Sequence, residues 1–365
     1  MANNLLHQIA LTLIPSIGPV HTKALIDHFG DAKTVFTAKR KELIAIEGIT
    51  DVKINAIKDF DNFAEAEAEI TFIEKYKIQP LFITDKDYPQ RLLHCYDAPP
   101  LLYYRGNANL NASKIISIIG TRSYTEYGKQ VTDTLVEELK AYNVLIVSGL
   151  AYGIDAIAHK AALHNSLPTV GVLAHGLDRI YPAHHKSMAK EMLQNGGLLT
   201  EFRKEMKADK HNFPRRNRIV AGMADATIVI ETALKGGSMI TAALANGYNR
   251  DVFAIPGRIN EEKSEGCNYL IKNNRAILLT DTQQLAENLG WERRKQKQKV
   301  QKELFIELNK EEQVIVDILK EKDLVHIDEL YLKSGLSSST VAAAILTLEL
   351  QSVIASLPGK MYKML

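Results

Sequence analysis

Cysteine is almost absent from this chain, which has two cysteines in 365 residues. Cys95 and Cys267 lie far apart in the sequence and form neither a metal-binding motif nor a redox motif. A disulfide framework is therefore not expected, and a reducing compartment is the expected environment.

Long apolar segments are also missing. No stretch of about 18 residues is both apolar and free of charge, so no membrane span is predicted. The first residues, Met-Ala-Asn-Asn-Leu-Leu-His, lack the basic segment and the apolar run of a secretory signal. The composition, with 46% apolar and 24% charged residues, is that of a globular protein. We expect a cytoplasmic protein with no membrane partner.

A large net charge is absent as well, because the formal charge is +2. The charge is nevertheless segregated along the chain. Residues 293–302 carry six basic side chains and no acid, and residues 203–218 carry seven basic against two acidic side chains. Concentrated positive charge attracts polyanions, of which nucleic acid is the usual one.

Changes in residue composition and in hydrophobic pattern along the sequence predict four regions: a helical domain in 1–75, a core in 76–290, a basic linker in 291–309 and a small domain in 310–365. In the first region, Ile14-Pro-Ser-Ile-Gly-Pro19 and Ile46-Glu-Gly-Ile-Thr50 are two hairpin signals about 30 residues apart. They are similar to helix-hairpin-helix motifs, in which a glycine turn lets backbone N–H groups approach a phosphate. A helical bundle used for packing or protein contact is the alternative, and both readings stay open.

The core shows strand and helix signals in alternation, preceded by an extended connection with a candidate strand at 101–104. Short β-branched runs end in polar or glycine-rich loops, and helical patterns follow them. This predicts an α/β fold with a mostly parallel, doubly wound sheet, whose ligands bind beyond the carboxyl ends of the strands. The expected strands are 115–119, 144–147, 169–173, 198–200, 227–230, 252–255 and 276–279. The expected helices are 126–142, 153–165, 184–195, 215–223, 238–249 and 267–274.

The run Phe213-Pro-Arg-Arg-Asn-Arg218 is the most informative strand-end loop. Pro214 suits the first position of a helix, and residues three apart on a helix share a face. We therefore expect Arg215 and Arg218 on one side, with Arg216 and Asn217 pointing elsewhere. An aromatic ring beside several cations is typical of single-strand binding, where bases stack on the ring and phosphates meet the guanidinium groups.

Three further loops offer phosphate contacts. Arg122 follows Gly120 at a predicted helix start, Ser148 and Gly149 permit close backbone approach, and Gly236-Gly-Ser238 opens another helix. The loop from His175 to His185 contains histidines, but no Cys or Glu accompanies them at ligand spacing. We expect no metal site there and no cofactor.

The last region predicts a winged-helix-like domain. Helices are expected at 311–320, 326–333 and 337–350, and Pro358-Gly359 marks the turn of a hairpin. The third helix carries no Lys or Arg, and acids outnumber bases in the domain. DNA-reading helices normally bring cations to the phosphates, so a protein contact or a regulatory role is favoured.

Six loops together resemble the DNA-processing protein A (DprA/Smf) family in order and spacing, over roughly residues 80–290. They are Gly120-Thr-Arg122, the stretch from Ser148 to His159, Gly176-Leu-Asp-Arg-Ile-Tyr-Pro182, Phe213–Arg218, Gly236-Gly-Ser238 and Ile255-Pro-Gly257. The resemblance implies an extended Rossmann-like core that binds single-stranded DNA without catalysing a reaction. It also implies a homodimer, protection of DNA entering during natural transformation, and loading of the RecA recombinase.

The resemblance also carries over candidate DNA-contact residues, to which Arg215 and Arg218 are added from the same basic run. The complete set is Arg122, Ser148, Gly149, Lys210, Phe213, Arg215, Arg216, Asn217, Arg218, Gly236, Gly237 and Ser238.

Two other classes of function fit the sequence less well. A nucleotide phosphoribohydrolase of the lysine-decarboxylase-like family also has a Gly-Gly loop at a helix start, but its carboxylate for acid/base work has no counterpart after Thr241. A structural scaffold does not explain why glycine- and arginine-rich loops gather at one edge of the sheet.

Overall fold

The computed structural model describes residues 2–291, 308–322, 324–351, 353–357 and 359–364, and the chain forms two compact units, Met1–Arg294 and Lys295–Leu365. The basic run 293–302 and most of the predicted linker lie outside the described residues. Among the described helices, none combines the length and the apolar character needed to cross a membrane.

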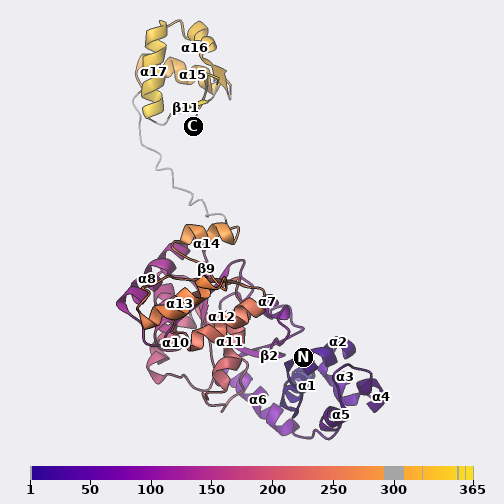
Figure 1. Cartoon of the computed structure of the whole chain (residues 1–365). Coiled ribbons are helices and arrows are strands. Elements are labelled where there is room, and N and C mark those ends of the chain that lie inside the picture. Colours follow the sequence, from indigo (N-terminus) through magenta and orange to yellow (C-terminus); the bar gives the residue numbers. More distant parts are fainter. Residues whose placement is uncertain (1, 292–307, 323, 352, 358, 365) are drawn as a thin grey trace. The chain divides into compact units, whose positions relative to one another are not determined.

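A nine-stranded sheet forms the centre of the first unit, in the order β1-β2-β6-β5-β4-β3-β7-β8-β9 (Figure 1). The strands from β6 to β9 in this order run parallel to one another, whereas β1 and β2 are antiparallel additions at one edge. The strands are β1 Gln79–Phe82, β2 Leu101–Gly106, β3 Ile115–Ile119, β4 Leu145–Ser148, β5 Thr169–Val172, β6 Gly196–Thr200, β7 Ala226–Val229, β8 Asp251–Ala254 and β9 Ile277–Leu278.

Helices follow the strands in alternation, which confirms the α/β, doubly wound class. Fully buried β-branched strands such as β3 need apolar cover on both faces, and the helices supply it. The helices are α7 Gln90–Leu93, α8 Glu126–Leu139, α9 Ile154–His164, α10 Lys186–Met192, α11 Asn212–Gly222, α12 Gly237–Gly247, α13 Glu262–Lys272 and α14 Thr282–Asn288, with 3₁₀ turns at Lys140–Tyr142 and Ala183–His185.

Several predicted boundaries are wrong. Helix α11 begins at Asn212, so Pro214 is its third residue, which costs nothing because the first four N–H groups of a helix have no partner within it. Helix α13 begins at Glu262, five residues before the predicted start. Strand β9 has two residues rather than four. Strand β1 was not expected; it contains Pro80 and lies at the sheet edge, where a missing N–H is tolerated.

Six helices precede the sheet and share one hydrophobic cluster with it. Two contacts show how they attach to the core. Lys23 Nζ donates to the Leu93 carbonyl at 3.2 Å, and the buried Glu69 carboxylate accepts the backbone N–H of Lys204 at 3.1 Å. The domain boundary at residue 75 stays a prediction. The helices are α1 Ala2–Leu13, α2 Pro19–Phe29, α3 Ala32–Thr37, α4 Arg40–Ile44, α5 Asp51–Lys58 and α6 Phe63–Tyr76.

The second unit has the elements of a winged helix, as predicted. Three helices pack around their own apolar cluster, and a three-stranded sheet in the order β10-β12-β11 completes it. The elements are α15 Lys310–Lys320, β10 Val325–His326, α16 Ile327–Ser334, α17 Ser338–Leu350, β11 Ile354–Leu357 and β12 Met361–Met364.

Candidate nucleic-acid interface

A cleft of about 580 Å³ lies at the carboxyl edge of the parallel strands, where the fold predicts a ligand site. The loops after β3, β4 and β7 form its walls together with the first turns of α11 and α12. Nine of the twelve candidate residues line it: Arg122, Gly149, Lys210, Phe213, Arg216, Asn217, Gly236, Gly237 and Ser238.

Phe213 and Arg122 form a stacked pair at the cleft. The Arg122 guanidinium carbon lies 5.1 Å from the centre of the Phe213 ring. Phe213 is half-buried in the first turn of α11, and Arg122 is exposed in the loop after β3. A guanidinium over a ring holds the ring in position while its N–H groups stay available for phosphate oxygens. The pair therefore presents a stacking surface and a cation together.

Arg216 lies at the floor of the cleft as a buried cation. Its side chain is 4% exposed, and Nη1 donates to the Val172 carbonyl at 3.0 Å. Burial lowers the pKa of the Arg216 guanidinium to about 10, a shift that the nearby Asp155 carboxylate opposes. The floor of the cleft thus holds a positive charge, and the Nε–H group of Arg216 has no hydrogen-bond partner among the described residues.

Asp155 lies in the first turn of α9, and its carboxylate charge acts on this guanidinium. Its carboxylate accepts the backbone N–H groups of Gly149 and Ala151 at 3.1 and 3.3 Å. Burial raises the pKa of the Asp155 carboxyl, while the Arg216 guanidinium and the hydrogen bonds oppose that rise. Asp155 therefore holds the loop after β4, and its charge acts on the buried guanidinium.

Gly149 has no room for a side chain. A Cβ atom built on it would lie 1.6 Å from Nη1 of Arg216. The glycine is needed because the guanidinium passes directly over the backbone of the loop after β4. The sequence predicted that Gly149 permits close approach to the backbone. In the structure, the group that approaches it is the side chain of Arg216.

Helix α12 points its N-terminus at the cleft. Gly236 caps the helix without a side-chain hydrogen bond, and Gly237 is exposed as its first residue. Ser238 is buried, and its Oγ donates to Thr232 Oγ1 at 2.6 Å. The first N–H groups of a helix lack partners within it and carry a partial positive charge, which suits a phosphate. Lys210, exposed at the same cleft, adds a cation.

Three candidate residues lie outside the cleft. Ser148 is fully buried, and its Oγ donates to the Ile118 carbonyl at 2.6 Å. Arg218 is buried and forms an ion pair with the Glu201 carboxylate. Arg215 lies 3.4 Å from that carboxylate, with its guanidinium over the Phe202 ring at 5.0 Å. The predicted common face of Arg215 and Arg218 is confirmed, but it faces Glu201.

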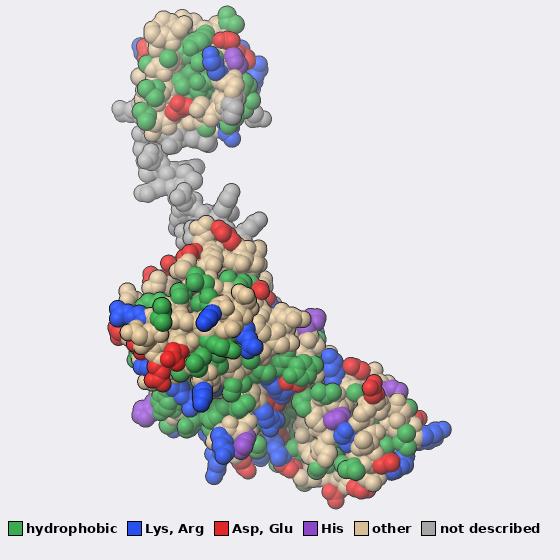
Figure 2. All heavy atoms as spheres, in the orientation of Figure 1, with side chains coloured by type: hydrophobic (Ala, Val, Ile, Leu, Met, Phe, Trp, Pro, Cys, Tyr) green, Lys and Arg blue, Asp and Glu red, His purple; other side chains and the backbone are tan. Residues whose placement is uncertain are grey.

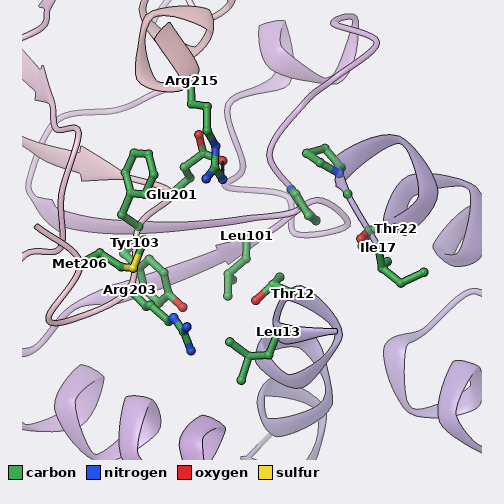
Figure 3. A pocket seen from close by; sticks show the side chains of 14 residues that line it. Thr12, Leu13, Ile17, Thr22, Leu101, Tyr103, Glu201, Arg203, Met206 and Arg215 are labelled. Carbon is green, nitrogen blue, oxygen red and sulfur yellow. Dashed lines mark hydrogen bonds and ion pairs between the residues drawn. The ribbon is translucent and has the colours of Figure 1, made fainter. Parts of the chain in front are cut away.

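This second face of α11 borders a cavity of about 280 Å³ between the core and helices α1 and α2. Figure 3 shows Arg215 and Glu201 side by side on one wall, with Ile17 and Thr22 of the N-terminal segment across from them. One oxygen of the Glu201 carboxylate and the Thr22 hydroxyl lack hydrogen-bond partners in the described structure. A polar cavity of this size holds water readily.

Two buried histidines of the core contact neighbouring backbone and side-chain groups. His159 is fully buried, with Nδ1 2.7 Å from Thr169 Oγ1, and burial lowers its pKa to about 3. His175 Nδ1 lies 2.9 Å from the Gly176 carbonyl. Among the described residues no group of three His, Cys, Asp or Glu is placed to hold a metal ion.

Two family models match the chain. The model described as "DNA recombination-mediator protein A" matches residues 79–290, and the "DprA winged helix domain" model matches residues 305–360. The first match contains every residue that lines the cleft.

Relatives and solved structures agree with these matches. The chain is 35% identical over 285 residues to Protein Smf of Synechocystis, covering 76% of this chain and 71% of the relative. It is 37% identical over 214 residues to DNA processing protein DprA of Streptococcus pneumoniae, covering 59% and 76%.

The X-ray structure of the S. pneumoniae protein covers 77% of this chain and 97% of its own, with 30% identity and a TM-score of 0.66. The Helicobacter pylori DNA processing protein A, whose structure describes a single-stranded DNA binding mode, covers 59% and 96%, with 34% identity and a TM-score of 0.53. The chain belongs to the DNA recombination-mediator protein A (DprA/Smf) family.

Proposed function

We propose that this chain binds single-stranded DNA in the cleft between α11 and α12, without catalysing a reaction. The observation that carries the proposal is the Phe213 ring with the Arg122 guanidinium over it, next to the open N-terminus of α12. A base stacks on the ring, and flanking phosphates meet the guanidinium and the N–H groups of the helix. The related H. pylori protein, which binds single-stranded DNA, supports this proposal.

The contacts explain why binding would not depend on the base sequence. Every base has a face that stacks, and the guanidinium and backbone N–H groups contact phosphates rather than base edges. Lys210 and Arg216 add positive charge to the same cleft, so affinity falls as the salt concentration rises. Duplex DNA hides its base faces and is expected to bind more weakly.

The cellular role, the oligomeric state and the RecA partner in this proposal are based on the resemblance to the DprA/Smf family. We infer that a cytoplasmic homodimer of the chain covers incoming single strands during natural transformation, protects them from nucleases, and helps RecA to load onto them. A protein that contacts the backbone and a few bases leaves the rest of the strand free for the recombinase.

Titration of a fluorescent oligonucleotide tests the cleft. Phe213→Ala removes the stacking surface and is expected to weaken binding about tenfold, since stacking on one ring contributes about 1–3 kcal/mol. Phe213→Tyr keeps the ring and serves as the control. If Phe213→Ala binds single strands as tightly as the unchanged chain, the cleft is not the binding site. Nuclease digestion and RecA filament assembly, measured with both variants, test protection and loading.

A further inference from the structure

Two exposed tyrosines lie next to the cleft, and the function proposed above uses neither. Tyr181, in the loop after β5, is 50% exposed, and Tyr152, in the loop after β4, is 44% exposed. Both line a small hollow that also borders Arg122, Phe213 and Arg216. Single exposed apolar groups are common, but adjacent aromatic rings beside a binding cleft indicate a contact surface.

We propose that the strand held over Phe213 continues across Tyr181 and Tyr152, which stack further bases. This inference rests on the proposed binding of single-stranded DNA and adds the path that the strand follows across the protein surface. It assigns to the two tyrosines a role as stacking platforms.

Tyr181 is held by its backbone while its ring stays free. Its N–H donates to Nε2 of the buried His175 at 3.2 Å, and the other ring nitrogen of His175 lies 2.9 Å from the Gly176 carbonyl. The Tyr181 ring centre lies 6.4 Å from that of Phe213, with the planes at 47°. The two rings are thus neighbours, and the Tyr181 residue keeps half of its surface exposed for a further base.

Tyr152 is supported from behind by two histidines. Its ring lies edge-on to His185 with centres 5.3 Å apart, and its hydroxyl is 3.4 Å from Nδ1 of His184. His185 is buried and lies 3.0 Å from the Leu150 carbonyl through Nδ1. The tyrosine therefore packs against the two histidines while 44% of the residue stays exposed.

The order of the strands places the loops that carry these groups next to one another. Neighbouring positions β7, β3, β4 and β5 carry Gly236, Arg122, Tyr152 and Tyr181 in the loops that follow them. Three steps between strands amount to about 14 Å, which is about four nucleotides at the rise of a stacked strand. A single strand that starts at the N-terminus of α12 therefore reaches the tyrosines within a few nucleotides.

The charge of the hollow fits the phosphates of nucleic acid and does not fit a basic protein segment, which would need acidic partners. Its lining contains the guanidinium groups of Arg122 and Arg216, and none of its described lining residues is an acid. Aromatic rings interleaved with arginines are the arrangement that single-strand grooves use.

A cycle of protein and oligonucleotide changes tests the proposal. Tyr181→Ala and Tyr152→Ala are each expected to weaken binding of a strand of about 16 nucleotides about tenfold, and to leave a single nucleotide over Phe213 nearly unaffected. Tyr181→Phe keeps the ring and is expected to bind normally. Tyr76→Ala, 41% exposed on α6, is the control for loss of an exposed tyrosine elsewhere.

Oligonucleotides with one abasic site, moved along the strand, separate stacking from a structural role. When the abasic site lies where a base would stack on Tyr181, it is expected to weaken binding by the unchanged chain about tenfold. The same abasic site is expected to cause no further loss of affinity in the Tyr181→Ala variant. If both Tyr→Ala variants bind long strands normally while Phe213→Ala does not, the path is wrong and the cleft function stands. If Phe213→Ala is also normal, the proposed function fails as well. Normal DNA binding with loss of RecA loading would identify the tyrosines as a protein contact and overturn the proposal.

Discussion

The two faces of helix α11 use the same kind of residue for different purposes. On one face, Phe213, Arg216 and Asn217 line the cleft beside Arg122. On the other face, Arg215 and Arg218 meet Glu201, and Arg215 borders the cavity against the N-terminal helices (Figure 3). The first face places its cation, Arg216, at the floor of the cleft, and the second face places its two cations against the Glu201 carboxylate.

The comparison teaches that a basic segment of sequence is not the same as a basic surface. Figure 2 shows Lys and Arg side chains gathered where the N-terminal helices meet the core. Several arginines of the basic run 203–218 are already paired: Arg203 with Glu65, and Arg215 and Arg218 with Glu201. Pairing costs a cation most of its attraction for phosphate, so the cleft face is expected to dominate DNA binding although it has fewer exposed arginines.

The largest expected effect lies on the paired face and concerns stability. Glu201→Gln leaves the guanidinium of Arg218 buried with only the more distant Asp97 carboxylate, 4.0 Å away, and removing one member of a buried pair costs about 3–5 kcal/mol. Urea denaturation is expected to show this loss, whereas DNA affinity below the unfolding transition stays unchanged. Asp51→Asn breaks the exposed pair with Arg40 and is expected to cost less than about 1 kcal/mol. A large loss of DNA affinity in Glu201→Gln would mean that the two faces are not separate.

A smaller effect is expected on the cleft face from Gly149→Ala. The new Cβ displaces the Arg216 guanidinium, so we expect a loss of about 1–3 kcal/mol of stability together with weaker DNA binding. Gly247→Ala, at the far end of α12, meets no atom within 4 Å and is the control. Thermal unfolding and oligonucleotide titration measure both effects. Unchanged DNA affinity would show that the position of Arg216 does not matter for binding.

The smallest effect concerns the salt dependence of binding. Lys210→Gln removes one cation from the cleft and is expected to reduce the slope of log K against log salt by about 0.7, the value for one phosphate contact on a single strand. Arg215→Gln, on the paired face, is expected to leave the slope unchanged. Equal changes in both variants would contradict the division between the faces.

The sequence predicted the cleft better than it predicted the partners of its residues. Strand-end loops meet at one edge of a parallel sheet, so Arg122, Phe213 and Gly236 were expected together and are found together. The spacing of three residues also predicted the common face of Arg215 and Arg218. Glu201 was missed, because its nearness depends on how β6 packs beside α11, which no local pattern records.

Other features that the sequence did not predict also depend on how distant segments pack together. Asp155 looks like a residue of an ordinary first helical turn, and only the fold shows that it faces Arg216. Tyr181 stands in a loop that the sequence singled out, yet its exposure beside Phe213 depends on the tertiary structure. Strand β1 is four residues long and contains Pro80, so its sequence lacks a strand pattern.

One matched pair of variants tests the central claim most directly. Arg122→Ala and Arg215→Ala each remove one arginine that lies against an aromatic ring, Arg122 at the cleft and Arg215 on the paired face. In titrations of a labelled single strand at one salt concentration, Arg122→Ala is expected to weaken binding about tenfold, as for the loss of a charge-assisted hydrogen bond. Arg215→Ala is expected to change the affinity by less than about twofold. Equal losses, or a larger loss in Arg215→Ala, would contradict the account.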